Sequence, residues 1–143
     1  MDLLLLHTAL TWSLVGLIWT VQVVQYPGFA LVGEPQLGRF HRHHSSRISW
    51  VVGPLMLLEL ATGLALLQWQ PPGLATPFLA LGLGLIGLNW ASTALLAIPL
   101  HQRVAEGDRG ALRGLVVSNW VRTLAWTARG GWSVLALRVA ISA

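Results

Sequence analysis

The sequence predicts an all-α integral membrane protein, a single domain in which residues 1–143 form a four-helix bundle with both termini outside. Hydrophobic residues make up 55% of the chain and charged residues only 10%, against about 25% charged in soluble domains. Four apolar stretches are separated by short links, and two of these links are rich in arginine. So few charges cannot cover a soluble surface, which excludes an ordinary cytosolic enzyme, a disordered tail and a nucleic-acid-binding module.

The four apolar stretches are Leu3–Val24, Ile48–Leu67, Phe78–Leu100 and Leu115–Ile141. A membrane-spanning helix needs about 20 mainly apolar residues. Lipid offers no water to bond the backbone, so each span should be α-helical. The first stretch lacks the basic start and the small-residue cleavage site of a signal peptide, and we expect it to remain as a span.

Arginines fix the expected orientation. The segment before the second span and the link after the third carry six arginines, whereas the link between the second and third spans and the N-terminal start carry none. The six are Arg39, Arg42, Arg47, Arg103, Arg109 and Arg113. By the positive-inside rule both Arg-rich links face the cytoplasm of a bacterial inner membrane.

Proline and glycine indicate where the helices turn. The link Gln68–Pro77 is short and proline-rich, so the second and third spans should be antiparallel neighbours. Tyr26-Pro27-Gly28 is expected to end the first helix. The second helix should run from about Pro35 to Leu67, about 50 Å at 1.5 Å per residue, with a kink at Pro54.

Polar residues inside the spans are the first candidate site. Glu59 lies near the middle of the second span, where a charge must face the bundle interior, pair or be neutralised. We expect one intramembrane polar layer, formed by Glu59, Asn89, Asn119, Arg122 and Arg129. Its role is either a buried ion pair that orients helices or a site for an anion or a proton path.

Histidines form the second candidate site. His41 and His44 share a helical face, and His101 ends the third span on the same side of the membrane. These three imidazoles are either a transition-metal site or a solvated basic stretch. His7 lies near the opposite end of the membrane, where it is either a hydrogen-bonded packing residue or a haem ligand. Gln22 and Tyr26, one helical turn apart, either line the inner mouth of a cavity or bond at the interface.

Several chemistries are excluded by composition. The chain has no cysteine, and all nine basic residues are arginine. Disulfides, thiolate metal sites, cysteine nucleophiles and Schiff-base lysines are therefore impossible. No serine–histidine–aspartate arrangement, phosphate loop or paired-carboxylate site is visible.

A layout of short motifs resembles a known group. His7 follows a short apolar start, Tyr26-Pro27 ends the first span, and Glu59-Leu60-Ala61-Thr62-Gly63 lies in the second. With Arg47-Ile48, Pro54, His101 and Asn119, this pattern resembles the HemJ-type protoporphyrinogen oxidases, the CopD-like group and uncharacterised bacterial membrane proteins. The HemJ-type resemblance implies haem b bound through His7 and oxidation of protoporphyrinogen. That family carries a functional lysine where this chain has Asn89 and Trp90.

Three functions follow as alternatives. The first is a membrane redox protein, with haem b held by His7 or His101, or a transition metal held by His41, His44 and His101. The second is a binding or transport module for a small anionic or hydrophobic compound. The third is an accessory subunit of a larger membrane complex, with or without pigment. Beyond the lipid bilayer itself, the expected partners are further copies of the chain or that complex, with no nucleic acid.

Overall fold

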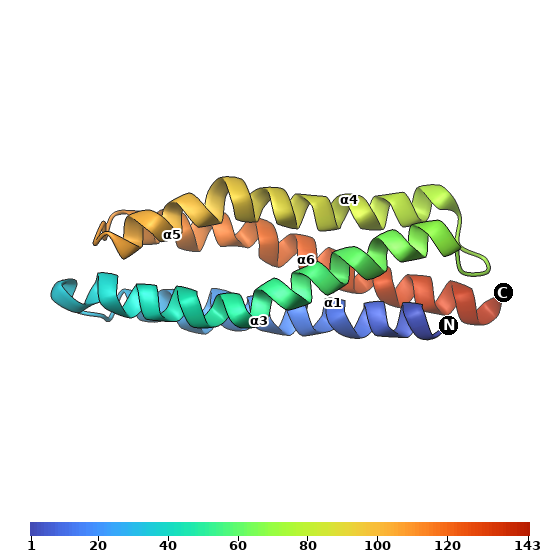
Figure 1. Cartoon of the computed structure of the whole chain (residues 1–143), viewed down its shortest axis with the longest axis horizontal. Coiled ribbons are helices and arrows are strands. Elements are labelled where there is room, and N and C mark those ends of the chain that lie inside the picture. Colours follow the sequence, from blue (N-terminus) through green and yellow to red (C-terminus); the bar gives the residue numbers. More distant parts are fainter.

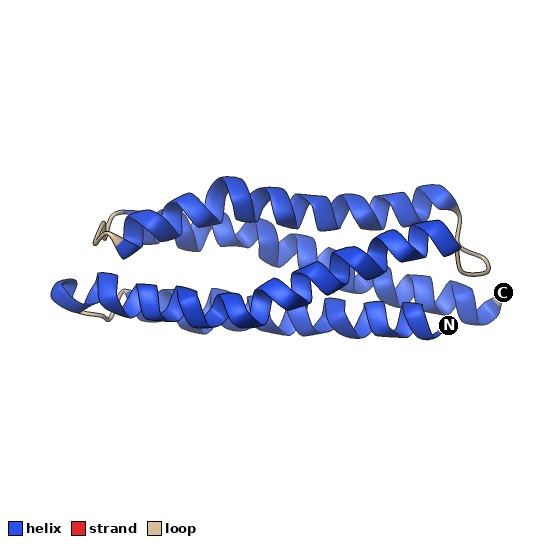
Figure 2. Cartoon of the chain, in the orientation of Figure 1, coloured by secondary structure: helices blue, strands red, loops and turns tan.

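Four long helical stretches run antiparallel along one axis in the computed structural model, which describes all 143 residues (Figures 1 and 2). The elements are α1 Asp2–Thr20, a π turn at Val21–Gln25, α2 Tyr26–Phe29, α3 Glu34–Trp69, α4 Thr76–Ser92, a second π turn at Thr93–Ala97, α5 Ile98–Ala105 and α6 Ala111–Ser142. The predicted all-α four-helix bundle is confirmed.

Three of the four stretches, Asp2–Phe29, Glu34–Trp69 and Thr76–Ala105, are long and apolar enough to cross a membrane. The fourth, α6, has 32 residues but is less apolar. Its side chains Asn119, Arg122 and Arg129 are buried inside the bundle. Most of its exposed large side chains are apolar, and its exposed arginines, Arg113 and Arg138, lie toward the two ends of the helix. This distribution, with polar residues inside and apolar residues outside, indicates a multi-pass membrane protein.

The two π turns correct the predicted helix ends. Tyr26-Pro27-Gly28 does not end the first helix, which continues to Phe29 through the π turn at Val21–Gln25. The second π turn likewise comes just before Pro99. Proline lacks the N–H for the helical bond to the residue four positions earlier, and its ring crowds that carbonyl. Widening the preceding turn lets each helix continue past its proline.

Helix α3 changes direction part-way along its length (Figure 1). Its first half contacts α2 and α5, through Phe29 and His101. Its second half packs on α1 and α4. Pro54 lies inside α3 and removes the backbone bond to the Trp50 carbonyl. We expect this missing bond to account for the change of direction of α3.

The links lie at two ends of the bundle. Both termini and the link Gln70–Ala75 are at one end, here called the terminal end, and the links Ala30–Gly33 and Glu106–Gly110 are at the other, the Arg-rich end (Figure 1). Arg109 donates to the backbone carbonyls of Val32 at 2.9 Å and Ala30 at 2.6 Å. It thereby satisfies carbonyls that the end of α2 leaves unpaired.

The apolar core is divided into two clusters. One extends toward the Arg-rich end and includes Leu14, Tyr26 and Leu115. The other is near the terminal end and includes Leu4, Leu66 and Trp132. The buried polar side chains lie between and beside these clusters and form the candidate site.

Candidate functional site

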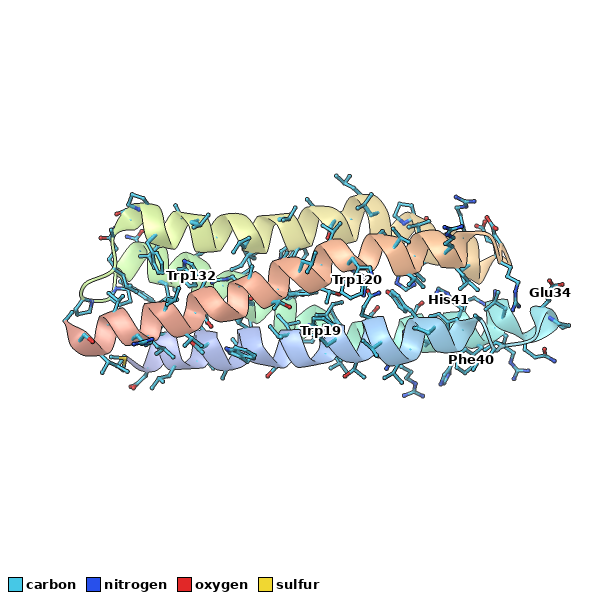
Figure 3. All side chains as sticks on the ribbon, turned by 180° about the vertical axis from the view of Figure 1, so that it is seen from behind. Trp19, Glu34, Phe40, His41, Trp120 and Trp132 are labelled. Carbon is cyan, nitrogen blue, oxygen red and sulfur yellow. The ribbon has the colours of Figure 1, made fainter.

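The buried polar side chains form two hydrogen-bonded networks at different positions along the bundle. The Glu59 network contains His7, Thr11, Glu59, Thr62, Trp126 and Arg129. The Arg122 network contains Gln22, Tyr26, His41, His101, Asn119 and Arg122. Figure 3 shows His41 toward the Arg-rich end and Trp132, which contacts the Glu59 network, toward the terminal end.

Glu59 is fully enclosed by donors from two neighbouring helices. Its Oε1 accepts from Thr11 Oγ1 at 2.9 Å and its Oε2 from Trp126 Nε1 at 3.0 Å. Arg129 Nε lies 4.0 Å from Oε1, and both side chains are 1% exposed. A buried ion pair of this kind is costly to break because the remaining charge has no water.

His7 bonds to the Glu59 network through both ring nitrogens, and these bonds select one tautomer of its imidazole. Its Nε2 accepts a hydrogen bond from Arg129 Nη2, which can only donate. Its Nδ1 therefore carries the proton and donates to Thr62 Oγ1 at 2.7 Å. Arg129 also lies over the Trp132 ring, 4.0 Å from its centroid, a favourable cation–π contact. Glu59 thus supplies the counter-charge of Arg129, while Arg129 Nε and Nη1 have no hydrogen-bond partner.

Arg122 has a different environment. Its Nη2 donates to the Tyr26 hydroxyl at 3.1 Å and to Asn119 Oδ1. Asn119 is itself fixed by a 2.7 Å bond from its Nδ2 to Gln22 Oε1. No carboxylate pairs with Arg122, although the residue is only 8% exposed. A buried cation without a counter-ion is unfavourable, so this position is prepared for an anion or another strong acceptor.

The tyrosine connects Arg122 to two histidines. The Tyr26 oxygen accepts from Arg122, and the same hydroxyl is hydrogen-bonded to His101 Nε2, 3.0 Å away. The other ring nitrogen of His101, Nδ1, is hydrogen-bonded to His41 Nε2 at 2.9 Å. Ser45 Oγ lies 3.4 Å from the same His101 nitrogen. The result is a continuous chain from Arg122 to the Arg-rich end.

A cavity of about 260 Å³ lies beside the Arg122 network. Most of its lining is apolar, with Leu14, Ile18 and Met56 among the side chains. Its polar lining includes Tyr26, His101 and Arg122. Trp90 also lines it, and the indole N–H of Trp90 has no partner. No aspartate or glutamate faces the cavity.

Both π turns contribute to this cavity. Val21 comes from the first turn, and Thr93 and Ala97 come from the second. A π turn adds one residue to the helix and shifts the side chains that follow it, and such turns are frequent at functional sites. Here the shifted residues include Tyr26 after the first turn and His101 after the second. The prolines thus help to build the site.

The predicted single polar layer is divided. Glu59 and Arg129 belong to one network and Asn119 and Arg122 to the other, so only one of the two arginines faces Glu59. The side chain of Asn89 is buried but bonds to neither network. Of the two residues expected at an inner mouth, Tyr26 lines the cavity, whereas Gln22 does not line it and bonds to Asn119.

The predicted metal ligands are not assembled. His41 and His101 bond to each other, whereas His44 packs on Phe29 with ring centroids 5.0 Å apart. No three histidine, aspartate or glutamate side chains converge in a way that could hold a metal ion.

A haem ligated by His7 or His101 does not fit this arrangement. Both ring nitrogens of His7 are engaged, by Thr62 and by Arg129. Both of His101 are engaged as well, by Tyr26 and His41. Neither imidazole therefore has a nitrogen free for iron.

Thr11 and Thr62 are site residues that the sequence did not single out, and Trp126 was expected only to share a helical face with Arg122 and Arg129. Spacing offered a signal for each of them. Thr11 follows His7 by four residues and Thr62 follows Glu59 by three, so each pair lies on one helical face. Polar residues that share the face of a buried charge are candidates to bond it. Trp126 lies between Arg122 and Arg129 on α6 in the same way.

No family model matches the chain, and searches of the curated proteins and of the solved structures find no match either. The resemblance to HemJ-type and CopD-like proteins therefore stays a prediction, and the site is interpreted from its own geometry.

Proposed function

We propose that this chain is a membrane binding protein for a small amphipathic molecule with an acidic head, held in the cavity beside Arg122. One observation carries the proposal: Arg122 is buried, lines an apolar cavity and has no carboxylate partner. Arg129, in contrast, already has Glu59. An anion at Arg122 would supply the missing counter-charge.

The hydrogen-bonding groups favour a carboxylate head. Both bonds that Arg122 makes use Nη2, so Nε and Nη1 remain for a ligand. A guanidinium presents paired N–H groups that match the two oxygens of a carboxylate. Trp90 adds an unpaired N–H to the lining. Tyr26 and Asn119 hold the guanidinium in place before the ligand arrives.

The remaining lining favours a short apolar body. Ligand sites for drug-sized molecules have volumes of about 300–1,000 Å³, and this cavity, at about 260 Å³, is slightly smaller. Leu14, Ile18, Val52 and Met56 offer only apolar contacts. A medium-chain carboxylic acid has the required combination of one acidic head and one short apolar tail.

The proposal includes the position of the chain in a membrane. All four helices, α6 included, cross the bacterial inner membrane, with the Arg-rich end in the cytoplasm and both termini outside. The arginines at the Arg-rich end support this orientation through the positive-inside rule. The cavity then lies in the cytoplasmic half of the membrane.

The test compares decanoate binding to two variants by isothermal titration calorimetry in phosphatidylcholine nanodiscs. Arg122→Gln removes the buried cation, and Arg138→Gln is the matched control because Arg138 is exposed on the same helix. A hydrogen bond to a charged group contributes about 1.5–3 kcal/mol, so Arg122→Gln should weaken binding by about 10–100-fold. Arg138→Gln should bind as the unchanged protein does.

Decanol is the ligand control, since it has the same tail without the charge. It should bind weakly to the unchanged protein and equally to Arg122→Gln. Equal decanoate affinity in the unchanged protein and Arg122→Gln would refute the proposed function.

A further inference from the structure

The cavity beside Arg122 opens through the side of the bundle. Most of its lining is buried or half-buried, but Ser49 on α3 is exposed and Ile98 at the start of α5 is 49% exposed. Gly53 and Thr93, on the same two sides, are half-buried. These four residues define the side opening, which lies between α3 and the stretch formed by the second π turn and α5.

A glycine and a proline of α3 lie beside the side opening. Gly53 has no side chain, and an added Cβ would meet nothing within 4 Å. Pro54 follows it inside α3, at the position where a kink is expected. On the opposite side the π turn Thr93–Ala97 packs against α6, whereas α3 packs against α4 and α5. The opening thus lies beside the Gly53-Pro54 step of α3 and the second π turn.

The surroundings of the side opening differ on its two sides. Exposed apolar residues lie next to it along both elements, among them Trp50, Val51 and Leu95. Toward the Arg-rich end there is a second, shallower hollow that contains Arg42 and Gln102. Ser49 and Ile98 line this hollow and the cavity alike. The opening thus lies where an apolar outer surface meets a polar one.

We propose, on the basis of the proposed function, that the ligand enters from the membrane through this side opening. An amphiphile dissolved in the cytoplasmic leaflet has its tail among lipid tails and its acidic head near the interface. At the side opening its head would face the hollow with Arg42 and its tail the apolar surface. The head then moves to Arg122 as the tail fills the cavity, and the ligand is never exposed to bulk water.

Substitutions at the side opening should change the rates at which the ligand binds and is released. Gly53→Trp and Ser49→Trp place a large ring across it, and two variants are used in case one fails to fold. Gly84→Trp is the matched control, because Gly84 also has free space around it and does not line the cavity. Circular dichroism and size-exclusion chromatography confirm that each variant is folded.

The measurement is stopped-flow quenching of tryptophan fluorescence by brominated decanoate, with the protein in phosphatidylcholine vesicles. Trp90 and Trp126 line the cavity and report its occupation. Lipid-facing tryptophans are quenched as well, so the cavity signal is the part of the quenching that Arg122→Gln abolishes. Blocking the opening should slow this part at least tenfold in both binding and release, whereas Gly84→Trp should leave it unchanged.

The outcomes separate the two proposals. Wild-type rates in both Gly53→Trp and Ser49→Trp, with an intact Arg122-dependent signal, would refute the side opening as the route and leave the binding function standing. The absence of any Arg122-dependent quenching in the unchanged protein would refute the binding function itself, and the route with it.

Discussion

Arg122 and Arg129 are two turns apart on one helix, yet their surroundings assign them different roles. Arg129 has a carboxylate, an imidazole and an indole face around it. Arg122 has a hydroxyl and an amide, and no negative charge. In the first arrangement the positive charge has a counter-charge, and the pair orients the helices. In the second the positive charge has no counter-charge, and the site is open to a ligand. The structural and the functional interpretation of a buried arginine therefore both apply, each to a different residue.

Glu59→Gln should strongly destabilise the protein, because it leaves Arg129 buried without its counter-charge. Loss of one partner of a buried pair costs about 3–5 kcal/mol. Thermal unfolding in detergent checks this, with Glu106→Gln as the control because Glu106 is exposed in a link. The double variant Glu59→Gln, Arg129→Gln should recover part of the loss. Unchanged stability in Glu59→Gln would contradict the pairing.

Asp108 provides a pH test outside the membrane. Hydrogen bonding from Arg103, and further donation by the Ala111 and Gly110 backbone, lower the pKa of the Asp108 carboxyl. The lowered pKa stabilises the folded link above the pKa of the unfolded chain, and this contribution is lost as the pH falls through the folded value. Arg103→Gln should raise the pKa of Asp108 in a carboxyl NMR titration. Arg113→Gln should not, and an unchanged pKa in Arg103→Gln would assign the shift to the backbone instead.

Helix α4 approaches α6 closely because of one glycine. A Cβ on Gly82 would lie 2.6 Å from both Arg129 Nη1 and the Trp132 ring. Two residues on, Gly84 has nothing within 4 Å. The two glycines therefore differ in the room available for a side chain, although both lie in the same helix.

Gly82→Ala should destabilise the protein by about 1–3 kcal/mol, the usual cost of overpacking. Gly84→Ala should be neutral or stabilising by up to about 1 kcal/mol, since alanine favours a helix over glycine. Thermal unfolding of the two variants side by side gives the comparison. Equal stabilities would mean that α4 does not pack on Arg129 as described.

The helices were predictable to different degrees. Apolar length predicted the three stretches that are long and apolar enough to span a membrane, and Glu34-Pro35 indicated the start of α3. The π turns were not predictable, because Pro27 and Pro99 are compatible with a helix end and with a widened turn. Only packing against α6 decides between these, and packing is not encoded in local sequence.

The sequence predicted which residues belong to the site better than it predicted which of them bond to one another. Depth along the spans indicated that Glu59, Arg122 and Arg129 face the interior, and all three are buried. Depth alone could not assign partners, because the arginines are two turns apart and Glu59 lies between their levels. In the structure Glu59 pairs with Arg129, and Tyr26, which follows the first π turn, bonds to Arg122.

The bundle as a whole has one Arg-rich end and one end almost without charge, and this asymmetry makes its orientation testable. Because the chain has no cysteine, single cysteines can report each end. Ala75→Cys in the terminal-end link and Glu106→Cys in the Arg-rich link are both exposed positions. In spheroplasts a membrane-impermeant maleimide should label Ala75→Cys directly and Glu106→Cys only after permeabilisation, because positively charged links are retained in the cytoplasm. The reverse pattern would place the cavity in the outer leaflet, and the ligand would then have to enter from that side.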